Sequence, residues 1–206
     1  MAASTDTPLL IAGLGNPGAQ YAKNRHNVGF MALDRIHDDY SFGPWRTKFQ
    51  GEMTEGKIAG RKAYLIKPQT YMNLSGDSVG AAARFLKLRP SALVVMHDEI
   101  DLAAGKLKAK TGGGDAGHNG LRSITATLGP DYARVRIGVG HPGGKKDVSG
   151  HVLGNFSKAD DEWLSPMLGA ISDAAPHLAD TDIIGFMNKV ALLLHPQDHK
   201  AKPEKL

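Results

Sequence analysis

The chain has 206 residues, of which 41% are hydrophobic and 22% charged, and this ordinary soluble composition excludes disordered, collagen-like and coiled-coil classes. It contains no cysteine, which excludes disulfides, thiolate nucleophiles, iron–sulfur clusters and cysteine-ligated zinc. The formal net charge of +4 and the pI of about 9.2 favour an anionic partner, although so small an excess is also common in proteins that bind no anion.

The length suits a single globular domain over residues 1–206, with loose ends at 1–7 and 197–206. No apolar run reaches the ~20 residues that a membrane-spanning helix requires. The first residues lack the basic and apolar regions of a secretory signal. We therefore expect a cytoplasmic protein that does not enter a membrane.

Residues 9–15 predict a buried first strand that ends in glycines, and Asn16-Pro17-Gly18 supplies a turn. The same stretch has the spacing G-x-G-x-x-G, which in dinucleotide-binding proteins opens directly into a helix. Pro17 and a further polar stretch intervene here, so the match to that motif is weak. We interpret the stretch as a tight turn that presents Asn16 at the carboxyl end of a strand, where open α/β sheets place their ligands.

Apolar residues with helical spacing predict an amphipathic helix over residues 27–39, which places His26 at its N-terminal end. Two strand-like runs follow, at 48–56 and 60–67, and they join around Gly60. This pattern predicts a hairpin.

Residues 69–76 predict a loop that leads into a second helix, with Ser75 as its expected N-cap and an end before Pro90. The run at 92–96 is apolar throughout and rich in β-branched residues, as in a central strand that is covered on both faces. This strand delivers Asp98 at its carboxyl end.

Lysines alternate with smaller or apolar residues over 105–110, which predicts an edge strand. The glycine-rich segment 112–117 follows, and its backbone freedom suits either a mobile lid or an ordinary flexible loop. A further helix is expected to start at His118.

Arg134 and Arg136 belong to a period-2 strand over residues 134–140 and should share one face of it. Beyond residue 157 the pattern predicts one or two helices, kinked or separated at Pro176. The alternation of strands and helices predicts an α/β fold with a twisted, mixed, mostly parallel sheet and helices on both faces.

Several polar side chains share a position at the carboxyl end of a predicted strand or the start of a predicted helix. They are Asn16, His26, Asn73, Asp98 and Asn119. Because the carboxyl ends of parallel strands meet at one edge of a sheet, we expect these side chains to converge there. His26 also has an asparagine on each side, and their amides could orient a neutral substrate. Taken alone, such a histidine is more often a cap of the following helix.

Hydrolysis by water is the chemistry that this set suits best. An imidazole can take a proton from water near neutral pH, and Asp98 can hold one ring nitrogen of His26 so that the other faces the water. The amide NH₂ groups can donate to an oxygen that becomes negative, and the amide carbonyls can accept from a peptide N–H. Since neither a G-x-S-x-G elbow nor a cysteine is present, we favour direct attack by water over a covalent intermediate.

Metal catalysis is the rival chemistry, because nine histidines and several aspartates could supply ligands. No H-E-x-x-H or comparable paired spacing occurs, so we expect no metal and no other cofactor. Four further histidines fit loop or supporting positions better than ligand positions: His97, His118, His141 and His151.

Six motifs occur in order between about Leu9 and Val190: GLGNPG, Y-x-x-x-RHNVGF, KPQTYMNLSG, HDEIDL, GGGDAGHNGLRS and RVRIGVGHPG. Together they closely resemble the bacterial peptidyl-tRNA hydrolases. The resemblance implies the α/β fold of that family and a monomeric enzyme that hydrolyses the ester between a peptide and the 3′ end of tRNA. Such an enzyme recycles peptidyl-tRNA that is released prematurely in translation.

The resemblance also implies roles for the converging side chains. The family's catalytic histidine falls on His26, and its supporting aspartate falls on Asp98. Its substrate-binding asparagines fall on Asn16, Asn73 and Asn119, and Asn16 is associated with telling blocked from free aminoacyl groups.

Contacts with the tRNA are expected from two groups of residues. By resemblance, Tyr21 and Tyr71 match positions that contact the acylated end, although position 71 is often phenylalanine in the family, which speaks against a role for the hydroxyl. By their charge, Lys108, Lys110 and Arg136 are candidates for phosphate contacts that weaken as salt rises. A solvated basic face is the alternative for these three cations.

A second functional hypothesis is a non-catalytic RNA-binding protein of the same fold, or a hydrolase of another acyl ester. The intact pair of His26 and Asp98 argues against the first, because a protein that only binds RNA has no need of a base.

Overall fold

The computed structural model describes residues 7–143 and 148–196. The expectation of loose ends therefore concerns residues that lie almost entirely outside the described ones. Thr7 is described, and its carbonyl oxygen accepts a hydrogen bond of 2.8 Å from Nε of Arg61.

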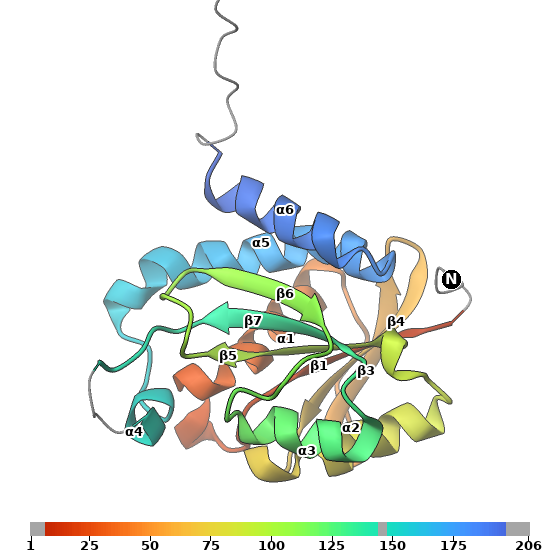
Figure 1. The fold of residues 1–206 in the computed structure, drawn as a ribbon. Helices are drawn as coiled ribbons and strands as arrows, with labels where there is room; N and C mark the ends of the chain where they lie inside the picture. The colour runs from red at the N-terminus through yellow and green to blue at the C-terminus, as the bar shows by residue number, and fades with distance from the viewer. Residues whose placement is uncertain (1–6, 144–147, 197–206) are drawn as a thin grey trace, which may run out of the picture.

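The described residues form one seven-stranded sheet with the strand order β2-β3-β4-β1-β5-β7-β6 (Figure 1). The strands are β1 (Leu9–Gly13), β2 (Arg46–Lys48), β3 (Gly51–Ile58), β4 (Arg61–Pro68), β5 (Leu93–Glu99), β6 (Leu107–Thr111) and β7 (Ala133–Gly138).

The centre of the sheet is parallel and its margins are antiparallel. β1 pairs in parallel with β4 and β5, and β5 pairs in parallel with β7. The expected hairpin is formed by β3 and β4, while β2 and β6 lie at the two edges and pair in antiparallel fashion. The prediction of a mixed sheet is confirmed. The prediction of a central strand at 92–96 is confirmed too, since every residue of β5 is buried.

Helices cover both faces of the sheet, as expected (Figure 1). The α-helices are α1 (Val28–Asp39), α2 (Ser75–Phe85), α3 (Asn119–Leu128), α4 (Val148–Val152), α5 (Asp161–Ala179) and α6 (Ile183–Leu194). Five one-turn 3₁₀ helices connect other elements: η1 (Ala19–Tyr21), η2 (Arg25–Asn27), η3 (Met72–Leu74), η4 (Pro90–Ala92) and η5 (Lys158–Asp160). One apolar core lies between the sheet and α1, α5 and α6, and a second lies between the sheet and α2 and α3.

Close packing of α1 against the sheet determines where His26 lies. A Cβ atom on Gly29, in the first turn of α1, would overlap the backbone of Leu14 and of Met96. Only glycine therefore lets the helix start approach the ends of β1 and β5 so closely. As a result, the residues just before α1 lie directly above the carboxyl end of β5.

Two predictions about helix ends were wrong. Ser75 is the first residue of α2 and does not cap it, because its hydroxyl donates backwards to the carbonyl oxygen of Met72 at 2.8 Å. Pro176 does not separate the two helices at its own position, since α5 continues to Ala179 and α6 begins at Ile183. The carbonyl of Ser172, which a proline at 176 leaves without its usual donor, accepts from the Tyr40 hydroxyl at 3.1 Å.

Candidate active site

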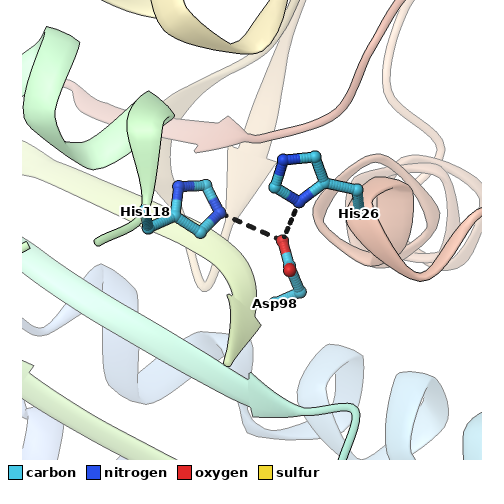
Figure 2. Close-up of side chains that lie close together, drawn as sticks. All are labelled: His26, Asp98 and His118. Atoms are coloured by element: carbon cyan, nitrogen blue, oxygen red, sulfur yellow. Dashed lines mark hydrogen bonds and ion pairs between the residues drawn. The ribbon is translucent and has the colours of Figure 1, made fainter. Parts of the chain in front are cut away.

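His26 and Asp98 come together at the carboxyl end of β5, as the sequence predicts (Figure 2). Nδ1 of His26 lies 2.8 Å from Oδ1 of Asp98, whose side chain is only 2% exposed. A carboxylate can only accept, so Nδ1 carries the proton and donates it to this bond. The lone pair is then on Nε2, the nitrogen of the His26 ring that faces away from Asp98.

His118 contacts the same carboxylate from the opposite side, and sequence analysis treated it only as a loop or supporting residue. It is the N-cap of α3, where its Nδ1 accepts hydrogen bonds from the backbone N–H groups of Gly120 and Leu121 at 3.2 and 3.4 Å. The ring proton therefore lies on Nε2, which donates to Oδ1 of Asp98 at 3.0 Å. A signal for the capping position existed in the sequence, because the predicted helix starts at His118.

The surroundings of Asp98 keep it ionised. Burial alone raises the pKa of its carboxyl, but electrostatic attraction to the His118 and His26 rings, and the hydrogen bonds that both rings donate to Oδ1, hold that pKa well below its ordinary value. Asp98 is therefore a carboxylate at neutral pH, able to stabilise an imidazolium on His26.

His97 supports Asp98 through the main chain. Its Nδ1 donates to the carbonyl oxygen of Asp98 at 2.7 Å, and its ring is 1% exposed. Burial, and then the neighbouring His118, lower the pKa of His97 to about 3. The His97 ring is thus neutral at physiological pH and serves as a fixed hydrogen-bond donor beneath the site.

Asn16 lies beside the His26 segment with its carboxamide held in one orientation. Oδ1 of Asn16 accepts from the backbone N–H of Met72 at 2.9 Å, so the NH₂ group is the end that the side chain can offer to a ligand. Its main chain is bound by Asn27, whose Oδ1 accepts from Asn16 N and whose Nδ2 donates to Asn16 O, both at 2.9 Å.

The two asparagines that flank His26 are therefore structural, and the idea that their amides orient a substrate was wrong. Asn27 is 2% exposed and both ends of its carboxamide bind Asn16. Asn24 is 3% exposed, and its Nδ2 donates to Oδ1 of Asn155 at 2.7 Å. Both side chains are thus almost fully buried and bonded within the protein, so neither presents its amide to a ligand.

The remaining predicted contact residues lie around this centre at the surface. Asn73 lies in η3 and Asn119 is the first residue of α3, and both are exposed. Oδ1 of Asn119 accepts from Arg122 at 3.3 Å, which leaves its NH₂ group as the free end. Tyr71, just before η3, is 63% exposed, and Tyr21 is half-buried at the end of η1.

A cleft of about 200 Å³ opens over the His26–Asp98 pair. It is lined by His26, Asp98, Glu99, Ile100, Ala116, Gly117, His118, Asn119, Val148, Ser149 and Val152. A second depression, of about 280 Å³, begins at Asn16 and Asn27 and extends over α1 to Lys67 and Gln69. His26 lines the first depression and the next residue, Asn27, lines the second.

Comparison with known proteins identifies the family. The family model described as peptidyl-tRNA hydrolase matches residues 10–201. The chain belongs to the peptidyl-tRNA hydrolase family. The peptidyl-tRNA hydrolase of Mesorhizobium japonicum is 65% identical to it over 184 residues, which cover 89% of this chain and 77% of the relative, and that of Ruegeria pomeroyi is 58% identical over 187 residues, with coverages of 91% and 78%.

Solved structures of the family have the same fold. The crystal structure of peptidyl-tRNA hydrolase from Acinetobacter baumannii superposes with a TM-score of 0.85 at 38% identity, and covers 91% of this chain and 96% of that one. The expectation of a peptidyl-tRNA hydrolase-like α/β fold is thus confirmed.

Three candidate phosphate contacts of this peptidyl-tRNA hydrolase family member lie on the α3 side of the sheet. Lys108 pairs across the strands with Arg136, and Lys110 pairs with Arg134. Both lysines are exposed. Arg136 is already engaged, because its Nε donates to Glu99 at 2.9 Å, and Glu99 is 4% exposed.

The geometry also brings three possible metal ligands together. Nitrogen atoms of His26 and His118 and an oxygen of Asp98 all lie within 4.8 Å of one another. The hydrogen bonds of 2.8 and 3.0 Å account for this proximity in full. The absence of a metal therefore stays a prediction. Among the described helices, none combines the length and the apolar character needed to cross a membrane.

Proposed function

We propose that this member of the peptidyl-tRNA hydrolase family cleaves the peptide–tRNA ester with water activated by His26. The single observation that carries this proposal is the hydrogen bond of 2.8 Å between Nδ1 of His26 and the buried Asp98 carboxylate. It orients the ring, places the lone pair on Nε2, and stabilises the imidazolium that forms when Nε2 takes a proton from water. The base then returns the proton to the departing 3′ oxygen of the tRNA.

Asn16 is the proposed selector for a blocked amino group. Its Oδ1 is occupied by the Met72 N–H, so it offers the substrate only an NH₂ donor. A peptide carbonyl accepts from this group, whereas the free ammonium of an aminoacyl-tRNA is itself a donor and gains nothing there. This geometry supports preference for peptidyl-tRNA over aminoacyl-tRNA.

Asn73 and Asn119 are the proposed donors to the ester oxygen that becomes negative. Both residues are exposed: Asn119 lines the cleft at the start of α3, and Asn73 lies in η3, which packs against α3. Their NH₂ groups can donate to a developing negative charge. Tyr21 and Tyr71 are proposed to contact the acylated tRNA end, which the high exposure of Tyr71 permits.

Lys108, Lys110 and Arg136 are proposed to bind tRNA phosphates. They share one face of the β6–β7 edge. Arg136 lies in β7, which is next to β5, the strand that carries Asp98. The exposed Lys108 and Lys110, with the partly exposed Arg136 beside them, can provide affinity that does not depend on sequence. We further infer one catalytic domain that acts as a cytoplasmic monomer without metal or cofactor.

Release of tRNA from N-acetyl-aminoacyl-tRNA tests the proposal, with unblocked aminoacyl-tRNA as the control substrate. The unaltered protein should cleave only the blocked substrate. His26→Ala should lower kcat by ~10²–10⁴, the usual value of a positioned base. His177→Ala is the matched control, because this histidine lies near the end of α5 and pairs with Asp182. Binding of the substrate without cleavage by the unaltered protein would favour a non-catalytic RNA-binding protein instead.

A further inference from the structure

The glycine-rich segment 112–117 is held from below by a buried arginine. Arg134 in β7 is 1% exposed, and its NH1 group donates to the carbonyl oxygen of Gly114 at 2.7 Å and to Oδ1 of Asp115 at 3.3 Å. Its guanidinium also stacks 4.5 Å from the ring centroid of Tyr132. The segment is therefore anchored at its middle, although its glycines alone predict freedom.

Asp115 connects Arg134 to helix α3. Oδ1 of Asp115 also accepts from the Thr125 hydroxyl at 2.8 Å, and that hydroxyl in turn accepts from NH2 of Arg134 at 3.3 Å. The main-chain carbonyl of Asp115 accepts from the N–H of His118 at 2.8 Å. Arg134, Asp115 and Thr125 thus form a closed set of hydrogen bonds that joins β7, the glycine-rich segment and α3.

His118 and Asn119 are the residues whose position depends on this set. They follow Asp115 by three and four residues, and the chain between passes through Ala116 and Gly117, with φ values of 47° and 77°. Glycine adopts such a conformation freely, but for Ala116 it is unfavourable and persists only where the surroundings enforce it. His118 then donates to Asp98, and Asn119 lines the cleft.

We propose that Arg134 is a positioning residue for the hydrolysis, acting through Asp115 to place His118 against Asp98 and the Asn119 amide in the cleft. The inference rests on the proposed function, because it assumes that Asp98 supports the base and that Asn119 meets the substrate. On this proposal, the glycine-rich segment is a fixed support for His118 and Asn119, whereas its glycines alone suggest a mobile lid.

An arginine is needed at this position for a geometric reason. Its planar fork reaches Gly114 and Asp115 with one nitrogen and Thr125 with the other. A lysine ammonium is a single point and cannot hold acceptors in that arrangement. Arg134→Lys should therefore keep the charge and loosen this support.

Steady-state kinetics on N-acetyl-aminoacyl-tRNA provide the first test. We expect Arg134→Lys and Thr125→Val each to lower kcat by ~10-fold or more, because small misplacement of catalytic groups is costly, and to leave KM within ~2-fold. The matched control is Arg61→Lys. Arg61 is also buried and binds the carbonyl oxygens of Thr7 and Ala179, but it lies at the start of β4, far from the cleft. It should lose stability without this loss of kcat.

Nitrogen chemical shifts of the histidines supply a readout that a merely structural role would not move. In folded Arg134→Lys, the His118 signals should depart from those of a ring protonated at Nε2, while those of His177 stay unchanged. If Arg134→Lys does not fold, Thr125→Val carries the test alone. Unchanged kcat and unchanged His118 shifts in a folded variant overturn the proposal. Loss of activity in His26→Ala is scored separately, so failure of the base assignment is distinguished from failure of this inference.

Discussion

Asn27 binds both main-chain groups of Asn16 with one carboxamide, accepting from Asn16 N through Oδ1 and donating to Asn16 O through Nδ2, each at 2.9 Å. A side chain that binds both main-chain groups of one residue pairs with it as the opposite residue of an antiparallel strand would. The orientation of the Asn16 side chain, and with it the proposed selection of blocked substrates, depends on this contact.

Asn27→Asp should therefore weaken selection as well as stability. The substitution removes the donor to Asn16 O and places a carboxylate oxygen against that carbonyl. Residue 27 is only 2% exposed, so water cannot solvate the new charge. We expect a loss of ~1–3 kcal/mol in the free energy of unfolding and a smaller ratio of kcat/KM values for blocked over unblocked substrate. Denaturant titration and paired kinetics measure both.

Asn24→Asp is the control for that substitution. Asn24 lies in the same segment and donates to Asn155, away from Asn16. It should cost stability and keep the substrate ratio. Equal ratios in the unaltered protein and Asn27→Asp would contradict the role given to the Asn16 orientation.

Asp98→Asn should slow the reaction and move its pH dependence. The amide oxygen can still accept from Nδ1 of His26, but the negative charge that stabilises the imidazolium is lost. Without that charge the ring gains a proton less readily. We expect kcat to fall by ~10²-fold or more and the acid limb of the kcat/KM profile to shift to lower pH. An acid limb at the unaltered pH would argue that Asp98 is not coupled to the base.

His97 should make stability fall as the pH is lowered below neutrality. Its pKa is lowered from 6.5 to about 3 in the folded state, so the unfolded chain takes up a proton over this range and the folded chain does not. Proton uptake then favours unfolding, at up to about 1.4 kcal/mol per pH unit between the two values. The stabilising effect of a neutral His97 is complete above pH 6.5 and is lost toward pH 3.

His97→Asn isolates this contribution, because an asparagine can still donate to the Asp98 carbonyl and does not titrate. Between pH 7.5 and 5.5, the unaltered protein should lose ~1 kcal/mol more than the variant in the free energy of unfolding. Denaturant titrations at the two pH values measure the difference. Parallel curves would mean that His97 takes up a proton in the folded state.

Lys108→Gln with Lys110→Gln should reduce the salt dependence of tRNA binding. Each phosphate contact contributes ~0.7–0.9 to the slope of log K against log salt, so the slope should fall by ~1.5 when both cations are removed. Lys62→Gln is the control, since Lys62 is 53% exposed and pairs with Glu55 on another strand. An unchanged slope would mean that the two lysines belong to a solvated basic face and do not contact tRNA phosphates.

Arg136 calls for a separate experiment because its Nε binds Glu99. Arg136→Gln should weaken tRNA binding and also destabilise the fold, since it leaves the carboxylate of Glu99, at 4% exposure, without its cation. The double substitution Arg136→Gln with Glu99→Gln should recover most of the lost stability while tRNA binding stays weak. Recovery of tRNA binding as well would show that Arg136 acts only through Glu99.

The sequence by itself determined the elements whose patterns are local. The apolar, β-branched run at 92–96 favoured a covered central strand, and the run at 9–15 with its glycine turn led to Asn16 at the correct sheet edge. Because parallel strands place their carboxyl ends together, the meeting of His26 with Asp98 followed from order and polarity alone. The motifs in their order identified the family.

Only the tertiary structure decided which hydrogen-bond partner each polar side chain has. Asn27 was indistinguishable in sequence from a substrate-binding amide, yet both ends of it bind Asn16. Proline interrupts helices in general. At Pro176, the Tyr40 hydroxyl donates to the carbonyl of Ser172 in place of the N–H that proline lacks. His118 joined Asp98, and Arg134 joined the glycine-rich segment, across gaps of about twenty residues. A sequence pattern records which groups can donate or accept, and packing alone determines which partner each of them meets.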